Sequence, residues 1–335
     1  MSIGVGVIGT GFMGRTWAEV AANHVNETHV VAVAGGKRAP DLAADYGAAL
    51  VASPAELLAR DDVELVVVAT QPDSHRDYVV AAAEAGKHAL VEKPMALDAR
   101  EAGEMVDAHQ RHGTRLAVCS QHRFRASPVA ALGLIRDGAI GTVRMVRAQG
   151  VITQDEEAYP DNEPYADMGF HVLDVLRGFV GGRGTLAYAQ QASYKGTPPL
   201  RGSTMAVYRF DNNVMASIWI SYELPQPGLG SMMQYLITGS TGMIRLDSYG
   251  QVELGNADGW KVAFEQPPFD PNNPNDPIRL QAYADELRDV VGAIRERRDP
   301  LVSGRWGRDT MELIDAARIA GETGRAVSLP LAERR

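Results

Sequence analysis

Short apolar runs alternate with amphipathic stretches along the first third of the chain, which is typical of strands alternating with helices. The apolar runs contain few polar residues, so we expect strands that are buried on both faces, as in parallel sheets covered by helices. The pattern predicts strands at residues 3–8, 28–34, 65–69, 88–91 and 116–119, with helices at 41–46, 73–85 and 98–112.

From residue 142 onward, strand-like runs follow one another and are joined by short turns. They lie at residues 143–152, 186–194, 204–210, 214–223, 234–238, 242–246 and 251–254, with turn signals at 211–213 and 239–242. Short connections favour antiparallel pairing, so we expect an α+β domain built on a large open, mostly antiparallel sheet. Helices predicted at 278–298 and 308–323 can cover only one face of such a sheet, and a partner subunit is the natural cover for the other.

A chain of 335 residues is too long for one typical core, and we expect two domains, residues 1–121 and 122–335. The formal net charge of −9 argues against binding to nucleic acid or acidic membranes. No apolar run reaches the ~20 residues of a membrane span, and the first residues lack the features of a signal peptide, so a cytoplasmic protein is expected. The single cysteine, Cys119, excludes an intrachain disulfide and a multi-cysteine metal site, and a small buried side chain is favoured over a reactive thiol. No metal site is predicted.

A glycine-rich segment, Gly9-Thr10-Gly11-Phe12-Met13-Gly14, follows the first predicted strand and opens a helical pattern. This is G-x-G-x-x-G in the context that the dinucleotide fingerprint requires. Gly9 permits a tight turn, Gly11 lets the backbone approach a pyrophosphate, and Gly14 allows close packing of helix and strand. The helix N-terminus then faces the anion. With the strand pattern, this predicts an α/β protein with an N-terminal Rossmann fold that binds a dinucleotide through Gly9, Gly11, Phe12, Met13 and Gly14.

The choice of cofactor is expected to depend on the end of the second strand, where an acid would bind the ribose 2′-hydroxyl of NAD. The chain has Gly35-Gly36-Lys37-Arg38 there and no acid. Gly36 leaves room, and Lys37 and Arg38 can pair with a 2′-phosphate. We therefore expect NADP to be preferred over NAD. The alternative is a solvated basic loop.

Two further turns follow predicted parallel strands, and we expect both to line the cofactor site because ligands bind at the carboxyl ends of such strands. The first contains Thr70, Gln71, Pro72 and His75, and the second is Glu92-Lys93-Pro94. His75 is as well suited to capping or packing as to cofactor contact, whereas Glu92 is expected to anchor the cofactor's ribose. An isolated lysine is usually a solvated surface residue, but Lys93 lies where a buried strand ends. Pro94 would stiffen this turn, and a cis bond before it would suit the turn.

Asp167 and His171 lie four residues apart, and residues 169–176 are predicted to be helical. In a helix this spacing puts both side chains on one face, and Asp174 follows three residues later. Either residue alone is compatible with a helix-start acid or a core histidine. With Lys93, they fit the oxidation of a secondary alcohol. His171 can accept the hydroxyl proton near neutral pH, and the Lys93 ammonium can stabilise the charge developing on the same oxygen. Asp167 can orient either residue and hold the substrate.

These motifs resemble the glucose–fructose oxidoreductase / inositol dehydrogenase / MocA (Gfo/Idh/MocA) family. The resemblance covers residues 9–14, 70–75 and 92–94, and it continues through 140–143, the D-x-G-x-H-x-x-D stretch at 167–174, and 300–304, so it spans essentially the whole chain. It implies an NAD(P)-dependent dehydrogenase or reductase acting on a sugar, cyclitol or related polyol, with the matching Lys, Asp and His as catalytic residues. It also implies a second domain for substrate binding and oligomerisation, whose open sheet forms the interface of a homodimer or homotetramer.

The chain departs from the family pattern where the acid after the second strand is missing and where residues 161–165 replace a Gly-Gly-Gly run. That segment lies beside the substrate in the family, so no particular substrate is carried over. Polar residues near the motifs suit a hydroxyl-rich ligand, namely Gln121, His122, Arg123, Gln154, Asp155, Tyr159 and Tyr165. Among them Arg123 and Tyr165 join Lys93, Asp167 and His171 as predicted substrate contacts, although Arg123 suits a structural salt bridge equally well.

Two other functions remain open. One is an enzyme that uses a tightly held cofactor transiently, as a hydrolase or an epimerase does. The other is a non-catalytic sensor that binds a dinucleotide and a protein partner, and the presence of Lys93, Asp167 and His171 argues against it. The Pro/Asn-rich loop at residues 266–277 is either an ordered lid or a mobile connection.

Overall fold

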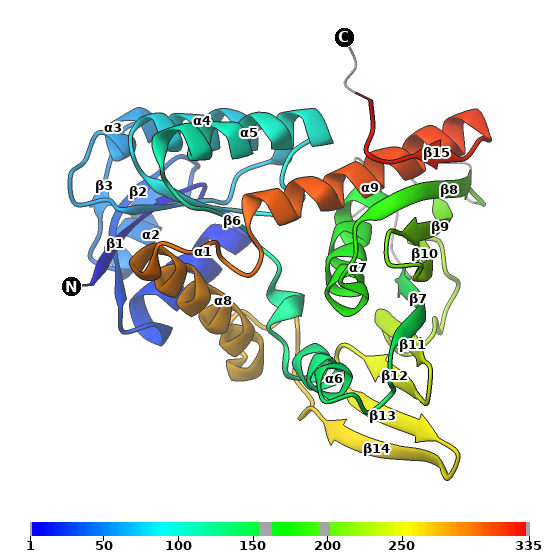
Figure 1. Ribbon diagram of the computed structural model, residues 1–335. Helices are drawn as coiled ribbons and strands as arrows, with labels where there is room; N and C mark the ends of the chain where they lie inside the picture. The colour runs from blue at the N-terminus through cyan, green and yellow to red at the C-terminus, as the bar shows by residue number, and fades with distance from the viewer. Residues whose placement is uncertain (1, 154–162, 195–201, 333–335) are drawn as a thin grey trace. The chain divides into compact units, whose positions relative to one another are not determined.

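The computed structural model describes residues 2–153, 163–194 and 202–332 (Figure 1). The chain forms two compact units. The first contains residues 1–124 and 269–311, and the second contains residues 125–268 and 312–335. The predicted division after residue 121 lies near the first of these breaks, but the contacts also assign residues 269–311, which we expected in the second domain, to the first unit.

The first unit is built on a six-stranded parallel sheet, as the run of apolar segments predicted. Its strands are β1 (Ile3–Ile8), β2 (Thr28–Ala34), β3 (Ala49–Leu50), β4 (Leu65–Val68), β5 (His88–Val91) and β6 (Leu116–Val118). Their order is β3-β2-β1-β4-β5-β6, which is the order of a Rossmann fold. The strands β1, β4 and β5 are buried almost throughout, because helices cover both faces of the sheet.

The helices of the first unit are α1 (Phe12–Glu19), α2 (Ala39–Asp45), α3 (Pro54–Leu58), α4 (His75–Glu84), α5 (Ala99–His112) and α8 (Pro277–Glu296). A π-helical turn at Val20–His24 continues α1. Local sequence fixes the helix ends: the Asp98 side chain accepts the Glu101 N–H at the start of α5, and Gly113 ends it in the left-handed conformation.

Helix α8 packs on α1 and its π-helical extension, and buries Leu280, Tyr283, Leu287 and Val290 in the core of the first unit. Asp276 caps this helix by accepting the N–H groups of Ile278 and Arg279. Its other oxygen accepts the N–H of Asp270, so the end of the 266–277 loop is folded onto the helix start.

The second unit is built on a nine-stranded sheet in the order β14-β13-β12-β11-β7-β10-β9-β8-β15. Its strands are β7 (Val143–Val151), β8 (Gly184–Ala192), β9 (Ser203–Phe210), β10 (Met215–Ser221), β11 (Met233–Gly239), β12 (Met243–Asp247), β13 (Gln251–Asn256), β14 (Gly259–Glu265) and β15 (Val327–Ser328). Neighbouring strands are antiparallel except β7 and β10, which are parallel. The prediction of a mostly antiparallel sheet is confirmed.

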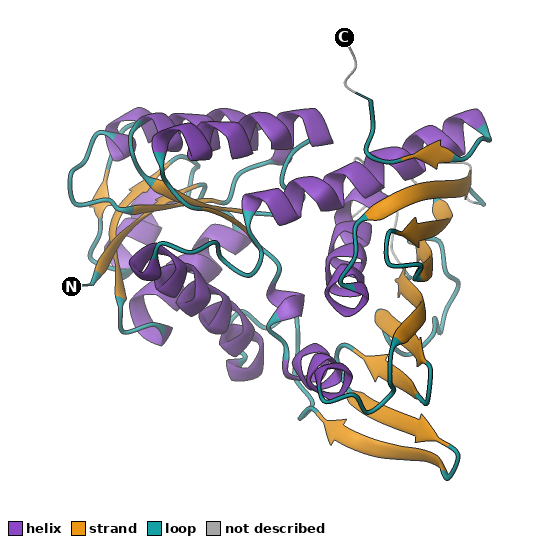
Figure 2. Cartoon of the chain, viewed as in Figure 1, coloured by secondary structure: helices purple, strands orange, loops and turns teal. Residues whose placement is uncertain are grey.

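Helices α6 (Ala126–Arg136) and α7 (Pro164–Val180) pack on one face of this sheet (Figure 2). The boundary between the units falls within a further helix, α9 (Gly304–Thr323). Gly150 of β7 permits the close approach of α7, because a Cβ built there would lie 2.7 Å from side-chain atoms of both Met168 and Val172. Helix α7 extends well beyond the predicted helical stretch at 169–176.

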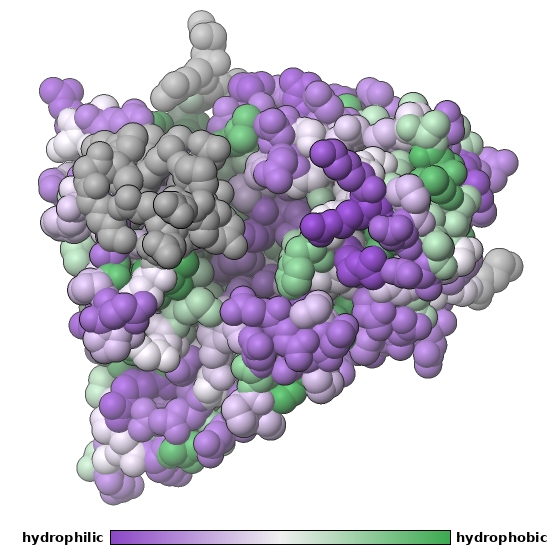
Figure 3. Space-filling model, turned by 180° about the vertical axis from the view of Figure 1, so that it is seen from behind, coloured by the Kyte–Doolittle hydropathy of each residue, from purple (hydrophilic) through white to green (hydrophobic). Residues whose placement is uncertain are grey.

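The other face of the nine-stranded sheet carries exposed side chains at every second position of the central strands. Met145 on β7, Met205 and Val207 on β9, and Met215 on β10 are exposed, whereas the residues between them are buried or nearly so. This alternation is expected for a sheet with one covered face. On the view of the molecule in Figure 3, hydrophilic residues predominate and hydrophobic residues form small separate patches.

Candidate active site

Three turns leave one edge of the six-stranded sheet side by side. Ile8 of β1 pairs with Val68 of β4, and Val68 pairs with Val91 of β5. Because the strands are parallel, the segments that follow these three residues emerge at the same level. They are the glycine-rich loop, the turn at Thr70–His75 and the turn at Glu92–Pro94. The motifs thus follow the carboxyl ends of parallel strands, as predicted, and the structure shows in addition that the three strands are neighbours in the sheet.

The glycine-rich loop has the geometry of a phosphate cradle. Gly9 adopts a φ of +95°, and a Cβ on Gly14 would lie 1.9 Å from the Gly9 carbonyl oxygen, so helix α1 can approach the loop only with glycine at position 14. At Gly11, by contrast, a Cβ would meet no atom of the described residues within 4 Å. Among the residues that the structure describes, no side chain caps the N-terminus of α1. The backbone N–H groups of its first turn therefore suit a pyrophosphate.

The segment after β2 packs against this loop. Thr10 Oγ1 donates a hydrogen bond of 2.9 Å to the Gly35 carbonyl oxygen, and a Cβ on Gly36 would lie 2.5 Å from the same hydroxyl. Gly35 and Gly36 both have positive φ, at 78° and 87°. Lys37 and Arg38 follow directly and are exposed. Lys37 and Arg38 therefore lie next to the glycine-rich loop within the first unit.

His75 links the second turn to the third. Its ring is fully buried, with Nδ1 3.0 Å from the Pro94 carbonyl oxygen and Nε2 3.2 Å from the Thr70 carbonyl oxygen. Burial lowers the pKa of His75 below its ordinary value. A neutral ring donates to only one of the two carbonyl groups. The described contacts of His75 are thus with the backbone of both turns, which gives it a packing role.

The third turn holds Lys93 between two fixed neighbours. The Lys93–Pro94 peptide bond is cis. Glu92 is buried, its N–H donates to the Val68 carbonyl oxygen at 2.9 Å, and its side chain accepts the indole N–H of Trp17 at 2.7 Å. The Lys93 side chain itself is half-buried.

Residues that follow β6 form a short 3-10 turn, Gln121–Arg123, at the same edge of the sheet. The Arg123 guanidinium lies 4.9 Å from the ring centroid of Trp306 and is largely buried. Just before the turn, burial raises the pKa of the Cys119 thiol and so disfavours the thiolate. A small buried side chain, as the sequence indicated, describes Cys119.

The predicted catalytic acid and histidine both lie on α7 in the second unit. His171 is 5% exposed, Asp174 is fully buried and Asp167 is half-buried near the helix N-terminus. The Asp167 carboxylate accepts a hydrogen bond of 2.7 Å from the Tyr222 hydroxyl, just beyond the end of β10. Tyr222 therefore fixes one oxygen of Asp167, a role that no sequence motif indicated.

Tyr165 differs from the other predicted substrate contacts because its side chain is fully buried. Its hydroxyl group hydrogen-bonds the Tyr208 hydroxyl, which in turn donates to the Leu313 carbonyl oxygen. Next to it, Glu163 pairs with Arg318 through two hydrogen bonds of 2.8 and 2.6 Å, which fixes the start of α7. The Tyr165 hydroxyl thus has partners within the second unit. The expected contacts at Gln154, Asp155 and Tyr159, and the substituted residues Asp161 and Asn162, lie outside the described residues.

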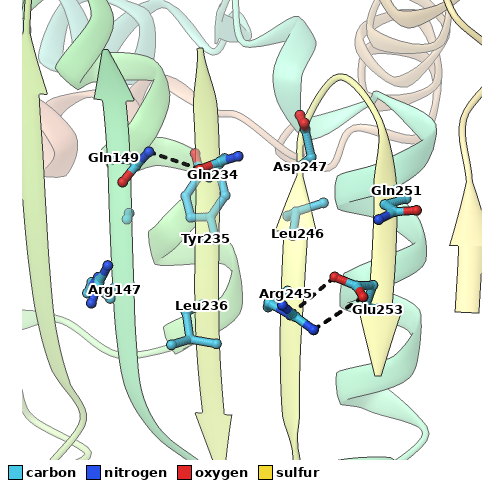
Figure 4. A pocket seen from close by; sticks show the side chains of 11 residues that line it. Arg147, Gln149, Gln234, Tyr235, Leu236, Arg245, Leu246, Asp247, Gln251 and Glu253 are labelled. Atoms are coloured by element: carbon cyan, nitrogen blue, oxygen red, sulfur yellow. Dashed lines mark hydrogen bonds and ion pairs between the residues drawn. The ribbon is translucent and has the colours of Figure 1, made fainter. Parts of the chain in front are cut away.

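A pocket on the uncovered face of the nine-stranded sheet contains none of the predicted site residues (Figure 4). Four of its polar side chains form two pairs: Gln149 Nε2 donates to Gln234 Oε1 at 2.9 Å, and Arg245 Nε lies 3.1 Å from Glu253 Oε2. Within residues 2–153, 163–194 and 202–332, no group of three or more His, Cys, Asp or Glu residues could hold a metal ion. The helices in this part of the chain are all too short or too polar to cross a membrane.

Comparison with known protein families gives two matches, one within the first unit and one within the second. Residues 3–120 match the family described as "Oxidoreductase family, NAD-binding Rossmann fold", and residues 129–245 match the "GFO/IDH/MocA C-terminal domain".

Two named dehydrogenases are similar in sequence to this chain. A D-apiose dehydrogenase from Paraburkholderia graminis is 28% identical over 82% of this chain and 75% of its own length. An inositol 2-dehydrogenase from Agrobacterium fabrum is 36% identical over 53% of this chain and 54% of its own. A crystal structure of an oxidoreductase from Agrobacterium radiobacter in complex with NAD+, L-tartaric acid and magnesium superimposes with a TM-score of 0.86, at 21% identity, over 98% of both chains. This last likeness shows that the fold is shared.

Proposed function

Because the chain belongs to the Gfo/Idh/MocA family of oxidoreductases, we propose that it transfers a hydride between a nicotinamide dinucleotide and a secondary alcohol or ketone of a sugar, cyclitol or related polyol. The observation that carries this proposal is the emergence of the Gly9–Gly14 loop and the Lys93 turn at one edge of one sheet. The relatives named D-apiose dehydrogenase and inositol 2-dehydrogenase support a polyhydroxylated substrate. The first unit binds the dinucleotide in this proposal, and the second contributes substrate contacts.

The chemistry needs three roles from this chain, while the nicotinamide supplies the hydride acceptor or donor. The Lys93 ammonium donates a hydrogen bond to the reacting oxygen of the substrate and stabilises the negative charge that develops there. His171 accepts the hydroxyl proton during oxidation and returns it during reduction. Asp167, held by Tyr222, orients His171 and binds the substrate. Arg123 and Tyr165 remain predicted substrate contacts.

A screen of nicotinamide absorbance tests the proposal. The protein is mixed with NAD or NADP and a series of inositols, pentoses and hexoses, and with NADH or NADPH and the matching keto-sugars. We expect turnover with at least one polyol–cofactor pair. Product formation at constant nicotinamide absorbance, with cofactor co-purifying, would instead show that the cofactor is used transiently. Dinucleotide binding without any turnover would favour the sensor.

We propose further that the enzyme prefers NADP to NAD. The exposed Lys37 and Arg38 follow a Gly-Gly turn that packs on Thr10 of the glycine-rich loop, and no acid stands in this segment to bind a ribose 2′-hydroxyl. Both cations can form charge-assisted hydrogen bonds with a 2′-phosphate.

Replacing both Lys37 and Arg38 with alanine should raise KM for NADP about 10- to 100-fold, as expected for the loss of hydrogen bonds between charged groups. KM for NAD should stay unchanged, because NAD lacks the 2′-phosphate. Steady-state kinetics with each cofactor measures both values, and Arg100→Ala on the exposed face of α5 serves as the control for lost positive charge. A wild-type preference for NAD would contradict this assignment.

We also propose that the chain forms a homodimer or homotetramer through the uncovered face of its nine-stranded sheet. Met145, Met205, Val207 and Met215 are exposed there on three adjacent central strands. Clustered exposed apolar side chains on a wide sheet are typical of a subunit interface.

Replacing Met205 and Met215 with lysine should convert the oligomer to monomers, because the substitution places charges within the proposed interface. Light scattering coupled to size-exclusion chromatography measures the mass. Val129→Lys, at an exposed position of α6, is the matched control and should leave the mass unchanged. A wild-type protein that is monomeric at all concentrations would refute the proposal.

We place the activity in the cytoplasm. The chain's only cysteine, Cys119, is a buried free thiol, and free thiols are typical of proteins in reducing compartments.

A further inference from the structure

Trp17, on the helix that begins at the glycine-rich loop, is hydrogen-bonded to the turn that carries Lys93. Its indole N–H donates to Glu92 Oε1 at 2.7 Å, across 75 positions of sequence. The Trp17 side chain is 1% exposed and Glu92 is 5% exposed, so the bond lies in the interior of the first unit. The indole has one donor and no acceptor, and this bond satisfies it.

Glu92, held by Trp17, also hydrogen-bonds the next residue, Lys93. Its second carboxylate oxygen, Oε2, accepts the backbone N–H of Lys93 at 3.2 Å. The carboxylate therefore lies between the Trp17 indole on α1 and the main chain of the turn that carries Lys93. Removing a partner from a buried carboxylate leaves it under-solvated, and the group then shifts toward water or another donor. The Lys93 backbone would move with it.

Helix α8 fixes Trp17 from the other side. The Tyr283 ring meets the Trp17 ring edge-on, with the centroids 5.2 Å apart. Arg279, one turn earlier, donates to Thr16 Oγ1 at 3.0 Å, and its guanidinium lies 4.8 Å from the ring centroid of Phe12. The first two turns of α1 are thus held by α8, so Trp17 has little freedom to follow a displaced Glu92.

We propose that Trp17 is a positioning residue for hydride transfer: its indole N–H fixes the Glu92 carboxylate, and Glu92 fixes Lys93. The same helix would then bind the dinucleotide at its N-terminus and set the place of the ammonium group that acts on the substrate. This inference rests on the proposed function, in which Lys93 contacts the reacting oxygen.

Trp17→Phe removes the donor and retains an aromatic ring. We expect kcat to fall about 10- to 100-fold, as for the loss of a hydrogen bond to a charged group, while the dinucleotide Kd, measured by fluorescence titration, stays close to that of the wild type. Val290→Ala, in the same α8 core but away from the Trp17–Glu92 bond, is the control. It should lower thermal stability without lowering kcat.

A double-mutant cycle tests whether Trp17 acts through Glu92. Glu92→Gln leaves the packing of Trp17 intact. It weakens the hydrogen bonds that the Glu92 side chain accepts from the Trp17 indole and from the Lys93 backbone N–H. If the two residues form one unit, Trp17→Phe with Glu92→Gln should be little worse than the worse single variant. Fully additive losses in kcat would overturn the proposal, as would a Trp17→Phe enzyme with wild-type kcat.

A spectroscopic readout tests the bond without any turnover. The chain has four tryptophans, so indole-labelled protein should give four Nε1–H signals. The signal lost in Trp17→Phe should be protected from solvent exchange and should shift in Glu92→Gln. An unshifted signal would refute the bond. If Trp17→Phe fails to fold, the Trp17 signal is the one that remains in all three of the variants Trp219→Phe, Trp260→Phe and Trp306→Phe. Lys93→Ala is measured in parallel: full turnover of that variant would overturn the proposed function, whereas an inactive Lys93→Ala beside a fully active Trp17→Phe would overturn only this inference.

Discussion

Replacing Lys93 with methionine should lower kcat about 10²- to 10³-fold, which is the usual loss when a preorganised donor to a developing oxyanion is removed. Methionine keeps an unbranched side chain of similar length and removes only the charge and the donors. The dinucleotide Kd should change far less than kcat, because the glycine-rich loop and the Thr70 turn provide most of the cofactor contacts in our proposal. Stopped-flow hydride transfer and a separate titration measure the two effects.

His171→Ala provides the companion test, because general acid–base groups contribute about 10²- to 10⁴-fold. If His171 moves the proton, imidazole added to the solution should restore part of the rate of this variant, whereas it should not restore Lys93→Met. His112→Ala, on the exposed end of α5, is the matched control and should keep wild-type kcat. Full turnover by either Lys93→Met or His171→Ala would refute the assignment.

The two sheets could be predicted from the sequence because their strands differ in pattern. Continuous aliphatic runs such as Leu65–Val68 are explained by burial on both faces, and alternating runs such as Ser203–Phe210 by burial on one. Strand β14 lacked either signal: Gly259–Glu265 is exposed at almost every position. Helix α6 was missed because Pro128 and Gly133 interrupt its apolar pattern, although Pro128 lies in the first turn, where proline is tolerated.

The sequence did not predict which segments, distant along the chain, pack against each other in the fold. Nothing in the segment 277–296 indicates that Arg279 hydrogen-bonds Thr16, more than 260 positions away. The amphipathic pattern predicted a helix and its apolar face but not the partner of that face, so α8 was expected in the second domain. The same limit explains why no local pattern indicated the hydrogen bond between Trp17 and Glu92.

The candidate site was predictable where a motif depends on the backbone, and less so where it depends on side-chain partners. The positions of Gly9, Glu92 and Lys93 follow from strand ends, which the pattern located. The partner of Tyr165 is Tyr208 on β9, and the partner of Asp167 is Tyr222, directly after β10; no local signal fixes the register of these strands. Register depends on which faces are covered, and that emerges only from the folded sheet.

Gly14→Ala and Gly11→Ala should affect different properties, although both glycines belong to one motif. The first should lower the stability of the fold, and the second should weaken dinucleotide binding. At Gly14 the added Cβ would lie 1.9 Å from the Gly9 carbonyl oxygen, which is backbone and cannot rotate away. Helix α1 would have to shift, so we expect Gly14→Ala to lower the free energy of unfolding by about 3 kcal/mol without any cofactor present, which is the upper end of the usual cost of overpacking. Thermal or chemical unfolding of the cofactor-free protein measures this loss.

Gly11→Ala should leave that stability unchanged, because the Cβ meets no described atom within 4 Å and Gly11 has a φ of −73°, which alanine adopts readily. The open space in front of Gly11 is, in our proposal, the space of the pyrophosphate. The dinucleotide Kd should therefore rise about tenfold or more, equivalent to about 1.4 kcal/mol. A stable Gly11→Ala protein with wild-type dinucleotide affinity would place the pyrophosphate elsewhere. A Gly14→Ala protein of wild-type stability would contradict the close contact between helix α1 and the loop. The two variants therefore distinguish an error in the proposed pyrophosphate position from an error in the backbone geometry of the loop.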